Sequence, residues 1–146
     1  MTKLMCLLSC YAVCASSLSS ASPIDYPPVD ANVRYKQVTE LAFKPATRKL
    51  DYGHSDNGLQ YGLLWLPAEP QSGEKPPLVI LIHGGCWLNA FNIEHTYPLS
   101  TALAQAGYAV WSLEYSRTGD AGGGWPGTFE DIKAGLAHTS QLGEFP

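Results

Sequence analysis

The sequence is poor in charge and lacks the features that several classes of protein require. Only 15% of its 146 residues are Asp, Glu, Lys or Arg, and the net charge is −4. Nucleic-acid binding usually depends on a basic patch, so this charge balance gives no electrostatic case for such a partner. The apolar run from Leu4 to Ala15 falls well short of the ~20 residues that cross a bilayer, so we expect no membrane span.

Residues 1–21 have the pattern of a secretory signal peptide. Lys3 carries the early positive charge, an apolar stretch follows, and small residues lead to a cleavage site after Ala21. We therefore expect an exported protein, either periplasmic or secreted. A lipoprotein anchored through Cys10 or Cys14 fits less well, because the residues before each cysteine match the usual small-residue pattern poorly.

Cysteine is scarce beyond this leader. Three of the four cysteines lie within the first 14 residues, which leaves Cys86 alone after cleavage. The mature chain can then form no internal disulfide, so its stability must come from an apolar core. No carboxylate or cysteine pattern surrounds His54, His95 or His138, so we expect neither a metal site nor a cofactor.

The remaining chain has the composition of a folded domain, with 45% apolar residues, four Trp and eight Tyr. Residues 22–47 are expected to form a linker and an N-terminal edge segment, in which the loose alternation over 33–43 predicts a strand. Residues 48–146 are expected to form a partial α/β domain. Its first feature is a turn at Asn57-Gly58, the strongest short hairpin signal in the chain.

Three strands and two helices follow from the hydrophobic pattern. The strands are predicted over Leu59–Leu66, over Leu78–Ile82 with both faces buried, and over Tyr108–Tyr115. One helix is predicted from Tyr97 to a stop at Gly107. The other is predicted from an N-cap at Thr128 to about His138, with one face made by Phe129, Ile132 and Leu136. This order predicts an antiparallel edge hairpin followed by a parallel βαβα unit.

The sharpest chemical signal directly follows the Leu78–Ile82 strand. It is the pentapeptide His83-Gly84-Gly85-Cys86-Trp87. Glycines at the carboxyl end of a central strand allow a sharp turn whose backbone N–H groups point into open space. In acyl transfer, such fixed donors stabilise the negative oxygen of the tetrahedral intermediate.

This pentapeptide resembles the oxyanion motif of α/β-hydrolase esterases. The similarity continues through residues 113–117 and 119–131, and upstream through residues 52–67. Over roughly Arg48 to Ala137 the chain resembles the esterase/lipase branch of that family, with its BD-FAE-like and kynurenine-formamidase-like members. The resemblance implies the N-terminal portion of an α/β-hydrolase fold that acts on a small-molecule ester or amide.

The resemblance also implies roles for individual residues. Gly85 and Cys86 match the residues whose backbone N–H groups form the oxyanion hole, and a backbone donor does not depend on its side chain. The remaining matches are loop support from His83 and Gly84, and substrate-pocket aromatics at Trp87 and Trp125. A rival interpretation makes Cys86 a nucleophile, but no Cys/His pairing signature surrounds it.

Two further patterns have competing interpretations. Residues 122–127 formally satisfy the dinucleotide-binding pattern G-x-G-x-x-G, but a proline lies inside it. The family resemblance makes this segment a structural loop near the site. Arg117 and Asp131 are either an ion pair that ties a strand end to the next helix or two solvated surface charges.

The chain contains no G-x-S-x-G, the elbow on which a serine hydrolase of this kind carries its nucleophile. We therefore expect the N-terminal part of a longer hydrolase, cut before the elbow and without the catalytic Ser, acid and His. The Leu78–Ile82 strand would then be left as a bare sheet edge. The alternatives are a non-catalytic remnant or binding fragment, or an arylformamidase or serine peptidase of the same fold.

Overall fold

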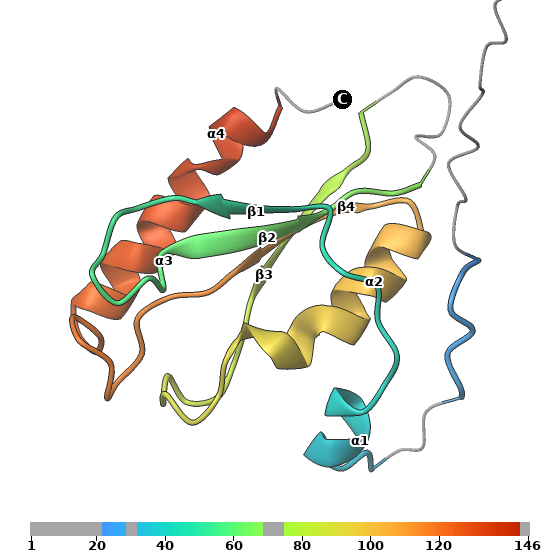
Figure 1. Ribbon diagram of the computed structural model, residues 1–146, viewed down its shortest axis with the longest axis horizontal. Helices are drawn as coiled ribbons and strands as arrows, with labels where there is room; N and C mark the ends of the chain where they lie inside the picture. Colours follow the sequence, from blue (N-terminus) through green and yellow to red (C-terminus); the bar gives the residue numbers. More distant parts are fainter. Residues whose placement is uncertain (1–21, 29–31, 69–74, 144–146) are drawn as a thin grey trace, which may run out of the picture.

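A computed structural model describes residues 22–28, 32–68 and 75–143, so the predicted signal peptide lies outside the described residues. Figure 1 shows a twisted sheet with helices on both sides. The described elements are α1 (Tyr35–Thr39), β1 (Arg48–Asp51), β2 (Tyr61–Trp65), β3 (Leu78–Ile82), η2 (Ile93–Thr96), α2 (Tyr97–Gln105), β4 (Ala109–Leu113), α3 (Gly127–Ala137) and α4 (Thr139–Leu142).

The four described strands form one mixed sheet in the order β1-β2-β4-β3. β1 pairs antiparallel with β2, and β2 pairs antiparallel with β4. β3 and β4 pair in parallel, with Ile80 opposite Trp111. The crossover between β3 and β4 runs through η2 and α2, which makes a βαβ unit. The predicted edge hairpin followed by a parallel βαβα unit is therefore confirmed.

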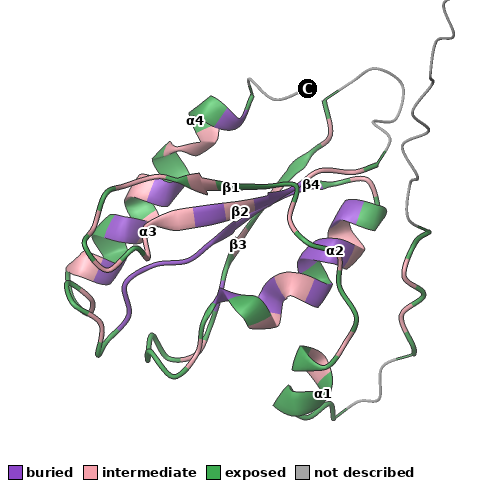
Figure 2. Cartoon of the chain, viewed as in Figure 1, coloured by how far each residue is buried: buried purple, intermediate pink, exposed green. Residues whose placement is uncertain are grey.

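β4 is the centre of the fold, and all five of its residues are buried (Figure 2). Val110 packs with Trp65 and Ala104 on the side of the sheet that α2 covers. Trp111 and Leu113 pack on the opposite side, which α3 and α4 cover (Figure 1). The core thus consists of two apolar layers that share one sheet. None of the described helices is long and apolar enough to cross a membrane.

β3 differs from its prediction, because only one of its faces is covered. Leu81 packs into the cluster on the α2 side. Ile80 points to the other side and remains 39% exposed, as do its neighbours Leu78 and Ile82 to a similar degree. The physical reason is position: β3 lies at the end of the described sheet and has β4 as its only strand neighbour there.

The strand predicted over residues 33–43 is wrong. The segment contains the short helix α1, whose first turn is closed by a 2.9 Å hydrogen bond from the Arg34 N–H to Gln37 Oε1. Lys36 Nζ and Glu40 Oε1 lie 3.5 Å apart and form an ion pair at the i,i+4 spacing of a helix. β1 pairs with β2 instead. Upstream, Ile24 exchanges two hydrogen bonds with the Gln105 side chain, which attaches this extended segment to α2.

α2 and the glycine after it match the prediction, since Gly107 has a φ of 96°. For α3 the predicted cap and face are wrong. The helix begins at Gly127, so Thr128 lies inside it, and its buried residues are Thr128, Asp131 and Gly135. The reason is a close helix–sheet contact: Trp111 Nε1 donates to the Gly135 carbonyl over 3.0 Å. A Cβ on Gly135 would lie 2.7 Å from Leu113 Cδ2.

Substitutions of the same kind on the two faces of β3 should destabilise the protein to different degrees. We expect Leu81→Thr to lower the free energy of unfolding by about 1–3 kcal/mol, since it removes packed apolar atoms and buries a hydroxyl. Ile80→Thr keeps a β-branched side chain on an exposed face and should cost under about 1 kcal/mol. Urea denaturation of both variants measures the difference. A larger loss in Ile80→Thr would contradict the assigned orientation of β3.

Candidate active site

The pentapeptide loop begins where β3 ends, and its first residue is fixed from several directions. His83 is buried, and its ring stacks on Tyr115 at a centroid distance of 4.2 Å. The Tyr115 hydroxyl donates to the His83 carbonyl oxygen over 2.5 Å. The imidazole Nε2 lies 2.7 Å from Glu114 Oε1. His83 therefore faces the protein interior.

Glu114 is the buried carboxylate that receives this histidine. Its Oε1 also accepts the Tyr115 N–H at 3.0 Å, and its Oε2 accepts the Ile93 N–H at 3.1 Å. Arg117 Nη1 lies 3.6 Å from the same Oε2. Burial alone would raise the pKa of Glu114, but the hydrogen bonds from His83, Tyr115 and Ile93 outweigh it and hold that pKa below its ordinary value. The carboxylate thus ties together β4, the loop and η2.

After His83 the backbone turns through left-handed conformations. The φ angles are 122° at Gly85, 53° at Cys86 and 56° at Trp87. L-residues with side chains reach this region at a cost of about 1–2 kcal/mol each, so the surrounding contacts must hold the turn. The Leu88 N–H donates to the Gly85 carbonyl over 3.0 Å and closes it.

The N–H groups of Gly85 and Cys86 are the notable feature of this turn. Among the described residues, no group accepts a hydrogen bond from either of them. Cys86 is exposed, and Gly85 is half-buried behind the Phe91 side chain. Two backbone donors are therefore left for an acceptor from outside the described chain, at the carboxyl end of β3.

A second loop, after β4, holds the first one in place. The Thr118 N–H donates to the Trp87 carbonyl at 2.7 Å, and the Asn89 N–H donates to the Thr118 carbonyl at 3.2 Å. Arg117 spans the two loops, since its Nη1 donates to the Phe91 carbonyl at 2.7 Å. Its Nε lies 2.8 Å from Asp120 Oδ2. The turn after β3 is thus held in place through backbone and guanidinium contacts.

Neither interpretation of Arg117 and Asp131 from the sequence is correct. Arg117 pairs with Glu114 and Asp120, as described above. Asp131 is buried on α3 and accepts from Gln60 Nε2 at 2.6 Å and from the Ser116 N–H at 2.9 Å. Asp131 therefore ties the end of β4 to α3 through neutral donors.

The two predicted pocket aromatics lie in one cluster, and the residue that joins them is Phe129. Trp87 meets the Phe129 ring edge-on at 4.9 Å, and Trp125 meets it edge-on at 5.0 Å. Trp125 is 81% exposed. The three rings form an apolar surface that adjoins the exposed Cys86. The helical spacing of Phe129 predicted a place on the core-facing side of the helix, so the sequence did not reveal its contacts with Trp87 and Trp125.

Other supporting residues were also missed. Glu114 and Tyr115 were visible only as the polar end of an apolar strand, a pattern that gives no indication of their contacts with His83. Phe91 carries no motif at all, although its side chain fills the space behind Gly85. Among the described residues, no group of three His, Cys, Asp or Glu side chains is placed to hold a metal ion.

Comparison with known proteins assigns the family. The BD-FAE family model matches residues 64–142, which include β3, the pentapeptide loop, β4 and α3. The chain belongs to the BD-FAE family. The family resemblance inferred from the His83–Trp87 motif is therefore confirmed, and the chain carries an esterase-like α/β-hydrolase domain.

Solved structures agree with this BD-FAE assignment. Two crystal structures of esterase B from Lactobacillus rhamnosis, one of them C6-C4 SN3 inhibited, each have 25% sequence identity and a TM-score of 0.56. Each alignment covers 75% of this chain and 35% of the esterase. The BD-FAE chain thus spans about a third of the length of those enzymes. No significant match was found among curated proteins.

Alanine should affect stability differently at the two neighbouring glycines of the loop, Gly84 and Gly85. A Cβ on Gly85 would lie 2.6 Å from Phe91 Cβ at a φ of 122°, whereas a Cβ on Gly84 meets nothing within 4 Å. We expect Gly85→Ala to lower the free energy of unfolding by about 2–3 kcal/mol and Gly84→Ala to change it by under about 0.5 kcal/mol. Chemical denaturation measures both, and equal losses would contradict the described turn.

The lowered pKa of Glu114 implies that the protein loses stability in acid. Because its folded-state pKa is lower than its unfolded value of about 4.5, its contribution is present above pH 4.5 and is lost as the pH falls through the folded pKa. We expect Glu114→Gln to lower the free energy of unfolding at pH 7 by about 2–4 kcal/mol and to flatten its decline in acid. Thermal unfolding from pH 7 to 3 measures this. Glu130→Gln, at an exposed residue of α3, is the matched control, and an equal effect there would refute the assignment.

Proposed function

We propose that this chain supplies the oxyanion-stabilising half of an exported serine hydrolase that cleaves carboxylic esters. In this proposal the N–H groups of Gly85 and Cys86 donate to the oxygen that becomes negative when the ester carbonyl is attacked. His83 and Gly84 support the loop. The observation that carries the proposal is the pair of backbone donors without an acceptor among the described residues, on a turn fixed at the carboxyl end of β3.

The chemistry depends on donors that do not have to move. During acyl transfer the carbonyl oxygen gains a full negative charge in the tetrahedral intermediate, and each preorganised donor lowers the barrier by about 3 kcal/mol. The buried contacts of His83 with Glu114 and Tyr115 hold the first residue of the loop before any substrate arrives. The backbone at Cys86 is left-handed, with a φ of 53°, and the residue is exposed, so a substrate could reach its N–H group.

The nucleophile has to come from outside these 146 residues, since they contain no G-x-S-x-G. β3 has an unpaired side in the described sheet. A further parallel strand on that side would end next to the oxyanion loop, where an elbow serine could reach the same carbonyl. The acid and histidine would follow that serine in chain order.

The substrate in this proposal is a small ester with an apolar portion. Trp87, Phe129 and Trp125 form the apolar surface that adjoins Cys86, and rings of this kind supply large contact area. An arylformamide or a peptide bond passes through the same type of intermediate, so these substrates are alternative outcomes of the test. The export in this proposal rests on the signal-peptide pattern of residues 1–21.

The chain should be inactive without the nucleophile. We expect the purified 146-residue protein to hydrolyse p-nitrophenyl acetate no faster than buffer and to remain unlabelled by a fluorophosphonate probe. Turnover that this probe inhibits would contradict the proposal. The nucleotide sequence after the Pro146 codon is the companion observation: a G-x-S-x-G there, in frame or frameshifted, supports the hydrolase, and its absence in every frame favours a non-catalytic remnant.

In a protein that includes the elbow, activity measurements distinguish the role of Gly85 from that of the elbow serine. We expect the protein that includes it to hydrolyse short-chain aryl esters, and Gly85→Ala to lower kcat by about 10²–10³-fold with a smaller change in KM. The matched control is alanine at the elbow serine, which should abolish labelling by the probe, whereas Gly85→Ala should retain slow labelling. An unchanged kcat in Gly85→Ala would overturn the oxyanion assignment.

A further inference from the structure

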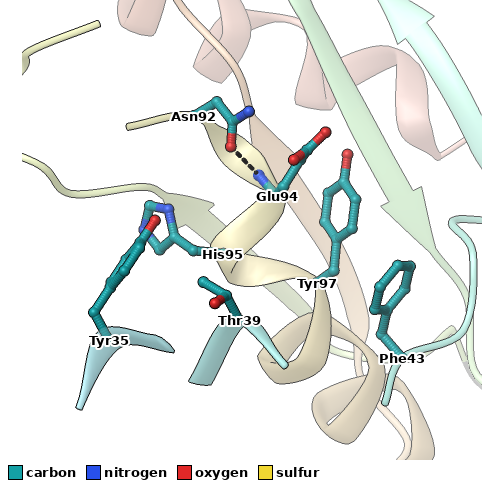
Figure 3. Close-up of a pocket in the computed structure, with 7 residues that line it drawn as sticks. All are labelled: Tyr35, Thr39, Phe43, Asn92, Glu94, His95 and Tyr97. Carbon is teal, nitrogen blue, oxygen red and sulfur yellow. Dashed lines mark hydrogen bonds between the residues drawn. The ribbon is translucent and has the colours of Figure 1, made fainter. Parts of the chain in front are cut away.

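A hollow lies between α1 and η2, and its lining includes neither Trp87 nor Trp125. Its volume is about 290 Å³. The lining comes from three segments that are distant in sequence, and consists of Tyr35, Thr39, Phe43, Asn92, Glu94, His95 and Tyr97. Figure 3 shows the Tyr35 and His95 rings on one side, the Tyr97 and Phe43 rings on the other, and Thr39 between them.

The four rings are held as two pairs. Phe43 and Tyr97 meet edge-on at a centroid distance of 5.2 Å, and Tyr35 lies 5.8 Å from His95. Tyr97 is held from behind by Trp65, at 5.6 Å. Four of the seven lining residues therefore carry rings, and the face of a Tyr or Phe ring attracts a nearby cation.

The charge of the lining is negative. Glu94 is exposed at the rim, and its side chain makes no hydrogen bond or ion pair with any described residue. None of the seven lining residues is Lys or Arg. Burial lowers the pKa of His95, so its imidazole is neutral at pH 7 and does not offset the carboxylate.

The cavity is linked to the oxyanion loop through two aromatic contacts. The Phe91 ring lies behind Gly85 and meets the Tyr35 ring edge-on at 5.6 Å. On its inner side, His95 meets the buried His83 ring at 5.7 Å. A molecule in the cavity would therefore lie next to the loop without occupying the position in front of Gly85 and Cys86.

We propose that this cavity binds the alkylammonium head of a small organic molecule, with Tyr35, Phe43 and Tyr97 around the head and Glu94 as its counter-charge. A lining with four aromatic rings, one carboxylate and no Lys or Arg matches a positive, poorly hydrated group better than it matches an anion or a neutral apolar group. The proposal stands on the residues of the cavity and does not depend on ester hydrolysis.

The test compares choline with 3,3-dimethylbutan-1-ol, a neutral molecule of the same shape. Saturation-transfer difference NMR on the 146-residue chain at constant ionic strength measures the affinity of each. We expect choline to bind saturably and about tenfold more tightly than the alcohol. Glu94→Gln and Tyr35→Leu should each weaken choline binding by about fivefold or more, and Glu130→Gln should leave it unchanged. Circular dichroism confirms that each variant is folded.

Several results would overturn the proposal. They are equal binding of choline and the neutral alcohol, choline binding that is insensitive to Glu94→Gln, or no saturable choline signal in the unmodified chain. The last measurement compares the binding of choline with that of dihexanoylphosphatidylcholine below its micelle concentration. Tighter binding than choline identifies a lipid headgroup as the source of the cation, and weaker binding identifies a free alkylammonium compound. Because no turnover is measured, failure here leaves the ester-hydrolase proposal intact.

Discussion

The buried contact between Glu114 and His83 is the constraint on which the described site depends. One carboxylate at the end of the central strand receives the His83 ring, the Tyr115 N–H and the Ile93 N–H. It thereby fixes the first residue of the pentapeptide loop and the start of η2 at the same time. Without it, only the contacts of Leu88, Thr118 and Arg117 would offset the unfavourable left-handed backbone at Cys86.

Much of the fold follows from local pattern. The aliphatic runs of β3 and β4 and the helical spacing that ends at Gly107 predicted their elements, because each signal lies within one segment. The errors occurred where neighbours decide. Residues 33–43 alternate only loosely, and a capping contact between Arg34 and Gln37 favours the short helix Tyr35–Thr39 within them. The buried face of α3 is chosen by the absence of a side chain at Gly135, where Trp111 and Leu113 approach, and hydrophobic spacing cannot reveal such a contact.

The candidate site was predictable to a similar extent. The pentapeptide identified the loop and the family, because it directly follows the β3 strand and includes Gly85, whose φ of 122° favours glycine. The residues that hold the loop come from other segments, as Glu114 and Phe91 illustrate, and no spacing in the sequence connects them to His83 or Gly85. The same holds for Phe129, which brings Trp87 and Trp125 into one surface. These contacts arise only when β4 pairs with β3 and α3 packs against β4.

The central claim is that Gly85 and Cys86 donate to a developing oxyanion. The most direct measurement is a crystal structure of these residues together with the elbow serine that the proposal requires, after reaction with a phosphonate ester. The account predicts a phosphonyl oxygen about 2.7–3.1 Å from the backbone nitrogens of both residues. A phosphonyl oxygen bound by other donors, with the Gly85 and Cys86 N–H groups turned away from it, would contradict the account.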